Sequence, residues 1–285
     1  MSDALLDAVT DTLKLTPILY ITYLFMEYIE HHMNEKINRR LENAKKAGPV
    51  IGALFGLLPQ CGFSGAASGL FTAGTITTGT LFAVFIATSD EMLPILISAH
   101  LPAKEILLIL LIKLLTGIFI GYLIDLLVRR KAAPSGKSIH SFCEQEHCSC
   151  EDGHENIFLS ALKHTVKIVL LIFIVTLALN LAFLLVSEEK ATTFSQLPVI
   201  NELLAALIGL VPNCSSSVLL TNLYVKDMIG IAPLLSGLMA NAGVGLLVLY
   251  RVNKNKKENI LITVSLYGIG VVCGLLTGTA ARMLL

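Results

Sequence analysis

The sequence predicts an all-α polytopic membrane protein, and three observations lead to this fold class. Hydrophobic residues make up 54% of the 285 residues and charged residues only 15%, whereas a soluble domain carries about 25% charged residues. Apolar runs that approach or exceed the roughly 18 residues needed to cross a bilayer occur several times. A motif of the first half, G-L-L-P-Q-C, also returns about 153 residues later as G-L-V-P-N-C, which predicts two related halves.

Six segments are long enough to be transmembrane helices, near residues 13–30, 78–98, 105–128, 157–187, 229–250 and 258–284. Between them lie two pairs of shorter apolar segments, near 49–58 with 62–72 and near 199–211 with 215–224. A helix of roughly 10–13 residues reaches only about 15–20 Å, which is less than the ~30 Å thickness of the hydrocarbon core. Each short pair is therefore expected to form a broken re-entrant hairpin, and ten short or tilted spans are the alternative.

The distribution of basic residues predicts the orientation of these helices. Lys and Arg gather at residues 36–46, 129–137 and 251–257, while the other connections carry about one basic residue each. The positive-inside rule places the three basic segments in the cytoplasm, so that six spans leave both termini outside the cell (inner) membrane. We therefore expect a first transmembrane repeat at 1–130, a cytoplasmic loop at 131–156 and a second repeat at 157–285. No cleavable signal is expected, because residues 1–11 contain acids in place of a basic region.

The internal repeat predicts that the second half is inverted relative to the first. Residues 56–61 align with 209–214, and with a two-residue slip 79–90 align with 230–241, so that Asn241 lies opposite Asp90. Each half then holds three long helices and one hairpin, and an odd number of spans reverses the orientation of the second half. Inverted repeats with discontinuous helices that meet near the midplane are a recurrent architecture of secondary transporters.

The expected hairpin tips carry polar residues. Pro59 and Pro212 stand in matched G-x-x-P settings. Each alone would be an ordinary membrane kink, but the match favours a functional break that frees backbone groups for a ligand. Candidate ligands with neutral oxygen or sulfur follow directly: Gln60, Cys61, Asn213 and Cys214. Either cysteine could equally be a small buried hydrophobic residue.

An acid pair, Asp90 and Glu91, lies past the middle of an apolar segment, where ionised side chains are costly. Two ionised carboxylates would repel each other, so either a cation lies beside them or one of them holds a proton. Glu91 could instead be solvated near the outer interface. Lys113, inside the next long helix, could neutralise this pair or extend to the interface. Carboxylate with amide oxygen suits Mn²⁺, whereas thiolate suits softer metals.

Two further groups of metal-ligating side chains lie on the expected cytoplasmic side. Glu27, Glu30 and His31 share one helical face, and could gather a divalent cation at the mouth or form an ordinary interfacial end. The loop holds half of the six cysteines, and its ligand-type residues are His140, Cys143, His147, Cys148, Cys150 and His154. Their spacing matches no standard zinc site, and disulfides are not expected in a reducing compartment. The loop is predicted to capture or sense a transition metal, with chance clustering as the alternative.

Several motifs together resemble one protein family. They are L-L-P-Q-C-G and A-T-S-D-E-M-L-P-I-L in the first half, and G-L-V-P-N-C, L-Y-V-K-D and G-I-A-P-L-L in the second. This pattern is similar to the ten-span heavy-metal exporter family, whose members are often labelled manganese transporters and are related by name to arsenic permeases. The resemblance implies that Cys61, Ser89, Asp90 and Glu91 bind metal. Residues 240–243 lack the acid or histidine expected there, so Asn241 is a neutral partner and the charge comes from the first half.

These features predict a secondary transporter that exports a divalent transition metal, such as Mn²⁺, in exchange for protons. Its expected partners are the lipid bilayer, the ion and protons; no cofactor is expected, and a homo-oligomer is left open. Zero net charge without a basic stripe excludes nucleic acid as a partner, and no Walker-type motif points to ATP. The alternative is a permease for an arsenical, an oxyanion or a small organic solute, bound at the helix N-termini that follow the breaks.

An enzyme is not expected, although residues 62–65 fit the G-x-S-G motif of intramembrane serine proteases. The serine of such a motif, here Ser64, needs a histidine on another membrane helix. His100 and His164 lie at the ends of the expected helices. A protease is therefore a remote alternative.

Overall fold

The computed structural model describes residues 47–58, 62–88, 92–128 and 200–284, together with isolated residues within 9–24 and 158–177. Every regular element in this part of the chain is a helix. Among the described residues, four segments are long and apolar enough to cross a membrane: Thr78–Ser98, Ala103–Leu127, Ile231–Val252 and Lys256–Leu276. These findings agree with the predicted all-α, multi-pass membrane protein. The other two expected spans, at 13–30 and 157–187, lie outside the described residues except for isolated positions.

The described part of the first half contains five helices, α3 (Gly48–Gly56), α4 (Gly62–Thr72), α5 (Thr78–Ala87), α6 (Met92–Ser98) and α7 (Ala103–Leu127). Side-chain hydrogen bonds fix the start of α5. The Thr77 side chain accepts a hydrogen bond from Thr80 N at 3.1 Å and so caps α5. The Asp125 carboxylate accepts from Thr77 Oγ1 at 2.7 Å and from Gly79 N at 2.8 Å. An acid at a helix N-terminus is stabilising, so Asp125 ties the start of α5 to the end of α7.

The second half repeats this series with α10 (Ile200–Gly209), α11 (Cys214–Val225), α12 (Ile231–Ala240), α13 (Gly245–Val252) and α14 (Lys256–Leu284). Each of these helices begins 152 or 153 residues after its counterpart. The bounds of the two short pairs agree with the predicted ranges. The two-residue slip in the alignment is wrong, because α5 and α12 correspond without it. Asn241 therefore corresponds to Thr88 rather than to Asp90.

Two of the predicted long helices are interrupted, which the sequence analysis did not predict. The segment at 78–98 consists of α5 and α6, and the segment at 229–250 corresponds to α12 and α13. At the second break, Gly243 N donates to the Asn241 side-chain oxygen at 2.7 Å, and Gly243 has a φ of 51°. Asparagine favours such a turn, and glycine adopts the left-handed conformation without steric strain. At the first break, Thr88 leaves the helical conformation with a ψ of 124°.

Equivalent glycines bring equivalent backbones together in the two halves. A Cβ on Gly56 would lie 2.6 Å from the Val84 carbonyl oxygen, and a Cβ on Gly209 would clash with the carbonyl oxygen of Gly237. Val84 and Gly237 occupy equivalent positions of α5 and α12. Small residues permit such close helix packing in membranes. The contact of α3 with α5 is thus repeated by α10 with α12.

The long helices α7 and α14 pack in the same way. A Cβ on Gly117 of α7 would lie 3.0 Å from the Ala83 carbonyl oxygen, and a Cβ on Gly270 of α14 would lie 3.0 Å from that of Ser236. Gly270 is the counterpart of Gly117, and Ser236 is the counterpart of Ala83, with the same spacing of 153 residues. Each half therefore forms one unit. In the first unit α3 and α7 pack against α5, and in the second α10 and α14 pack against α12.

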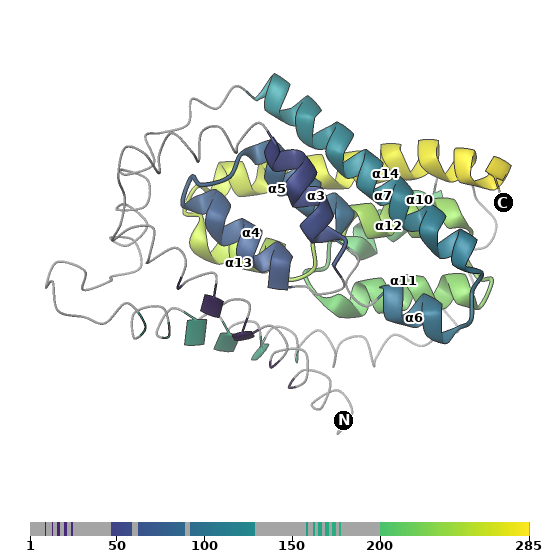
Figure 1. Ribbon diagram of the computed structural model, residues 1–285, viewed down its shortest axis with the longest axis horizontal. Coiled ribbons are helices and arrows are strands. Elements are labelled where there is room, and N and C mark those ends of the chain that lie inside the picture. Colours follow the sequence, from purple (N-terminus) through teal and green to yellow (C-terminus); the bar gives the residue numbers. More distant parts are fainter. Residues whose placement is uncertain are drawn as a thin grey trace, which may run out of the picture.

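The two units interlock through their remaining helices. Figure 1 shows α4 beside α13 at one end of the molecule and α6 beside α11 at the other. Ser68 Oγ of α4 donates to the Gly245 carbonyl oxygen of α13 at 2.7 Å. A Cβ on Gly245 would lie only 2.9 Å from the Ser64 carbonyl oxygen, so α4 and α13 begin side by side. The start of α4 and the break at 241–244 therefore lie close together.

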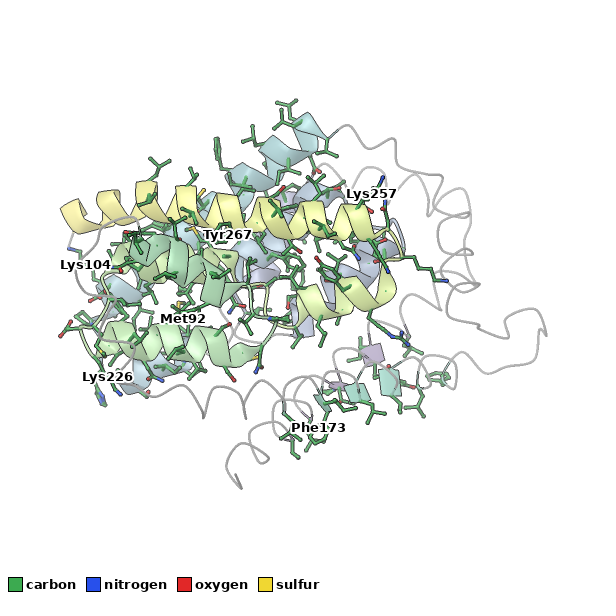
Figure 2. All side chains as sticks on the ribbon, turned by 180° about the vertical axis from the view of Figure 1, so that it is seen from behind. Met92, Lys104, Phe173, Lys226, Lys257 and Tyr267 are labelled. Carbon is green, nitrogen blue, oxygen red and sulfur yellow. The ribbon has the colours of Figure 1, made fainter. Side chains whose placement is uncertain are left out.

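Lysines lie at the two ends of the packed helices. In Figure 2, Lys104 and Lys226 lie at one end of the helices and Lys257 lies at the other, while Met92 lies between them. Met92 is fully buried at the start of α6 and belongs to the main hydrophobic core. The first break thus borders the interior of the protein.

Candidate functional site

Lys113 marks the place where the two units meet. It lies near the middle of α7 and is fully buried. Its ammonium group donates hydrogen bonds to the carbonyl oxygens of Thr88 and, at 3.4 Å, of Leu238. Of the two predicted roles, extension to the interface is wrong, because the side chain points into the protein. Neutralisation of Asp90 or Glu91 stays a prediction, since both acids lie outside the described residues.

Both carbonyl groups belong to helix C-termini. Thr88 is the C-cap of α5, and Leu238 lies in the last turn of α12. The last carbonyl groups of a helix have no partner within it, and they form the negative end of the helix dipole. Lys113 of α7 therefore contacts the C-terminal ends of α5 and α12, which are the first segments of the two discontinuous helices. This arrangement concentrates partial negative charge around a buried position that holds a cation.

Asn213 and Cys214 lie at the start of α11, as the repeat predicted. Asn213 is the N-cap and is fully buried, and its amide nitrogen donates to Ser215 Oγ at 3.0 Å. Its carbonyl oxygen accepts from Ser216 Oγ at 2.8 Å. Cys214 is 3% exposed, and its carbonyl oxygen accepts from Ser217 Oγ at 2.7 Å. The tip of the second short pair is thus a buried, polar turn.

Asn241 is the C-cap of α12 and is 2% exposed. Its side-chain oxygen shapes the turn through Gly243 N, so this oxygen has a structural partner. The corresponding Thr88 bonds through its side chain to the Val84 carbonyl oxygen at 2.7 Å. The two equivalent breaks are therefore stabilised by different local contacts. The two breaks therefore have their backbone groups in common, and not a matched pair of side chains.

A set of buried hydroxyl groups follows the tips, and sequence reasoning did not single it out as a repeated feature. Ser68 Oγ donates to the Ser64 carbonyl oxygen at 3.0 Å in α4, and Thr221 Oγ1 donates to that of Ser217 at 2.7 Å in α11. These four residues are buried. The signal that could have found them is the recurrence of serine or threonine at the same offset as the G-x-x-P motifs.

The remaining predicted site residues lie outside the described part of the chain. They are Glu27, Glu30, His31, Gln60, Cys61, Ser89, Asp90, Glu91 and the loop residues His140, Cys143, His147, Cys148, Cys150 and His154. Among the residues that the structure describes, no three His, Cys, Asp or Glu side chains come together. Asn213, Cys214, Asn241 and Lys113 are therefore the predicted site residues whose surroundings are known.

The protease motif does not gain a catalytic partner within the described residues. Ser64 is fully buried in α4, next to α13. His100, the histidine in this part of the chain, lies in the turn after α6 and pairs through Nδ1 with the Ser98 carbonyl oxygen at 2.8 Å. A serine nucleophile needs an adjacent base, which His100 does not provide here.

Comparison with known proteins gives one match. Residues 1–186 match the sequence model of a family described as "Putative, 10TM heavy-metal exporter". The match extends over the first half, the expected loop and the segment that follows it. No curated protein and no solved structure matches the chain.

Proposed function

Because the chain belongs to this family of 10TM heavy-metal exporters, we propose that it exports a divalent transition metal, such as Mn²⁺, in exchange for protons. The observation that carries the proposal is the meeting of two discontinuous helices around a buried cation, Lys113. Helix breaks inside a membrane are tolerated where they line a cavity or bind an ion. Secondary transporters place their substrate sites at such breaks.

The acid pair would supply the negative charge. Asp90 and Glu91 follow Thr88 and precede Met92, which are 4% and 0% exposed. The burial of both neighbours supports a role for the acids inside the protein. Two adjacent carboxylates can alternate between a metal ion and protons, because they repel each other when both are ionised. The proposed neutral ligands are Gln60, Cys61, Ser89, Asn213, Cys214 and Asn241, and oxygen among them suits Mn²⁺.

The helix arrangement supports an inverted repeat with re-entrant hairpins. The start of α5 is tied to the end of α7, whereas α7 itself begins beside Lys104. The pair α5–α6 therefore runs toward the Lys104 end, and α12–α13 runs from Lys226 toward Lys257 (Figure 2). A Cβ on Gly48 would clash with Thr80, so α3 also begins at the end where α5 begins. Such opposed units can move against each other during transport.

The orientation follows from charge. The end that carries Lys257 also carries Arg251, Lys254 and Lys256, and by the positive-inside rule we assign it to the cytoplasm. Both termini would then lie outside the inner membrane. Glu27, Glu30 and His31 would form the cytoplasmic mouth. The cysteine- and histidine-rich loop at 131–156 would capture or sense the metal.

One observation favours a second candidate, a permease for an arsenical or another anionic solute. The helices α4 and α13 begin side by side at Ser64 and Gly245. Two helix N-termini that meet create positive potential, which suits negative charge. A solute of this kind would leave the cellular content of divalent metals unchanged, so one experiment separates the two functions.

That experiment measures the content of each metal in cells that express the chain. Wild type should lower the content of Mn²⁺ or another divalent metal relative to cells without it. Asp90→Asn and Cys61→Ser should restore the content, because each removes a proposed ligand. Asp227→Asn is the matched control, since Asp227 is exposed in a turn with a φ of 57° that asparagine tolerates. The exporter proposal fails if neither site variant changes the content of any metal.

A further inference from the structure

The burial of Lys113 is difficult to explain by packing alone. A charged side chain inside a membrane protein is costly unless it is paired, and it usually has a function. The equivalent position of α14 holds Leu266, which is also fully buried. The second half therefore fills this position with an apolar side chain of ordinary size. The shared architecture of the two halves does not itself require a charge on α7.

Two of the partners of Lys113 are oxygen atoms of a kind that also binds metal ions. Thr88 supplies a carbonyl oxygen from the end of α5, and Leu238 supplies one from the end of α12. Backbone carbonyl oxygens are good ligands of hard and borderline divalent cations. Both lie at helix C-termini, whose dipoles favour a positive charge. The position of the ammonium group is therefore suited to a small cation in general.

Resting on the proposed export of a divalent metal, we infer that Lys113 holds the place of the transported ion. The carbonyl oxygens of Thr88 and Leu238 form part of the cation site, and the ammonium group of Lys113 occupies it in this structure. The arriving metal ion displaces the ammonium group, whose four-carbon chain can move. When the metal ion leaves, Lys113 returns to the same oxygen atoms.

Without a bound metal ion, the transporter then has one defined state, in which Lys113 is bound to the two carbonyl oxygens. With Lys113 in place, its side chain links α7 and α5 of the first unit to α12 of the second unit. Displacement of Lys113 removes the link, so that binding of the metal changes how firmly the two units are joined. A ligand shifts a conformational equilibrium only through different contacts in the two states. Competition between Lys113 and the metal ion supplies that difference.

The test measures metal binding to the purified full chain in lipid nanodiscs, by equilibrium dialysis against Mn²⁺, Co²⁺, Zn²⁺ and Cd²⁺. Lys113→Leu copies the residue of the second half and removes the competing charge. It should bind the preferred metal at least about tenfold more tightly than wild type, because a nearby positive charge opposes a dication. Lys113→Arg, which keeps the charge, should not gain affinity. Unchanged or weaker binding by Lys113→Leu would overturn the inference.

The failure of this inference differs from the failure of the proposed function. If neither wild type nor Lys113→Leu binds any of the four metals, the metal-export proposal falls, and this inference falls with it. If wild type binds a metal and the loss of the charge does not tighten binding, only the inference falls. Lys113→Gln keeps a hydrogen-bond donor without the charge. It replaces the leucine variant if that variant does not elute as a single species, and it should also bind more tightly than wild type.

Discussion

At the residue scale, the two helix breaks use different side chains for one backbone geometry. Thr88 presents its carbonyl oxygen to Lys113, whereas Asn241 holds the turn through Gly243 N at 2.7 Å. Both residues are buried, and both follow the last residue of the preceding helix. A buried polar group without a partner is destabilising. The contacts of Thr88 and Asn241 therefore help to keep these breaks formed.

Substitution of Asn241 tests this role directly. Asn241→Ala removes the acceptor of Gly243 N and should destabilise the folded protein by roughly 1–3 kcal/mol. Asn241→Asp keeps an acceptor oxygen and should unfold at a higher temperature than the alanine variant. Thermal unfolding, followed by size-exclusion chromatography, gives the unfolding temperature of each variant and of wild type. Equal unfolding temperatures for wild type and Asn241→Ala would show that the turn does not depend on this bond.

At the element scale, close backbone contacts fix how α3 meets α5 and how α10 meets α12. Gly209 of α10 leaves no room for a Cβ because of the Gly237 carbonyl oxygen. Gly268 of α14 is exposed, and a Cβ there would meet nothing within 4 Å. The two glycines thus differ in surroundings while sharing a helical backbone. They form a matched pair for substitution.

Gly209→Ala should separate α10 from α12 and destabilise the protein by about 1–3 kcal/mol, as overpacking does. Gly268→Ala should be neutral, or stabilising by up to about 1 kcal/mol, because alanine favours a helix more than glycine does. Thermal unfolding of both variants beside wild type measures the difference. A loss of stability in Gly268→Ala as large as in Gly209→Ala would contradict the proposed contact.

Much of the element plan could be predicted from the sequence, and the exceptions have a physical cause. The four short helices follow from short apolar segments beside Pro59 and Pro212, and α7 and α14 follow from uninterrupted apolar runs. The breaks after α5 and α12 were missed because the segments 78–98 and 229–250 are each apolar over most of their length. The first break also depends on a tertiary contact, the hydrogen bond from Lys113 to the Thr88 carbonyl oxygen. Apolar periodicity carries no record of such a partner.

The candidate site could be predicted only in part, for a related reason. The motif repeat correctly placed Asn213 and Cys214 at the start of α11. It paired Asn241 with Asp90, because aligning Gly79 with Gly230 shifts the pairing by two residues relative to the helices. The carbonyl groups of Thr88 and Leu238 left no signal in the sequence, since every residue has one. Their role depends on where the helices end.

At the scale of the whole molecule, the described helices form two units that contact each other through α4 with α13 and through α6 with α11 (Figure 1). In each unit, α4 or α11 packs both against the discontinuous helix of its own unit and against a helix of the other unit. Movement of one unit must therefore change contacts in both. In the proposed transporter, alternating access would move one unit against the other.

Chemical labelling tests the proposed orientation of the units. In a chain whose native cysteines are replaced by serine, Lys104→Cys and Lys226→Cys should react with a membrane-impermeant maleimide added to intact cells. Lys257→Cys should react only after the membrane is permeabilised, because it lies at the opposite end (Figure 2). All three lysines are exposed, so burial does not limit the reaction. Labelling of all three positions in intact cells would exclude opposed ends.

The central claim is that the chain moves a divalent transition metal against protons, and flux in proteoliposomes tests it most directly. With an acidic interior, wild type should take up Mn²⁺ as protons leave, and a protonophore should abolish the uptake. Asp90→Asn should reduce the rate at least about tenfold, because replacing even a residue that only supports a metal ligand costs about 10–100-fold, while Asp227→Asn should match wild type. Absence of any gradient-driven flux of Mn²⁺, Co²⁺, Zn²⁺ or Cd²⁺ would contradict the account.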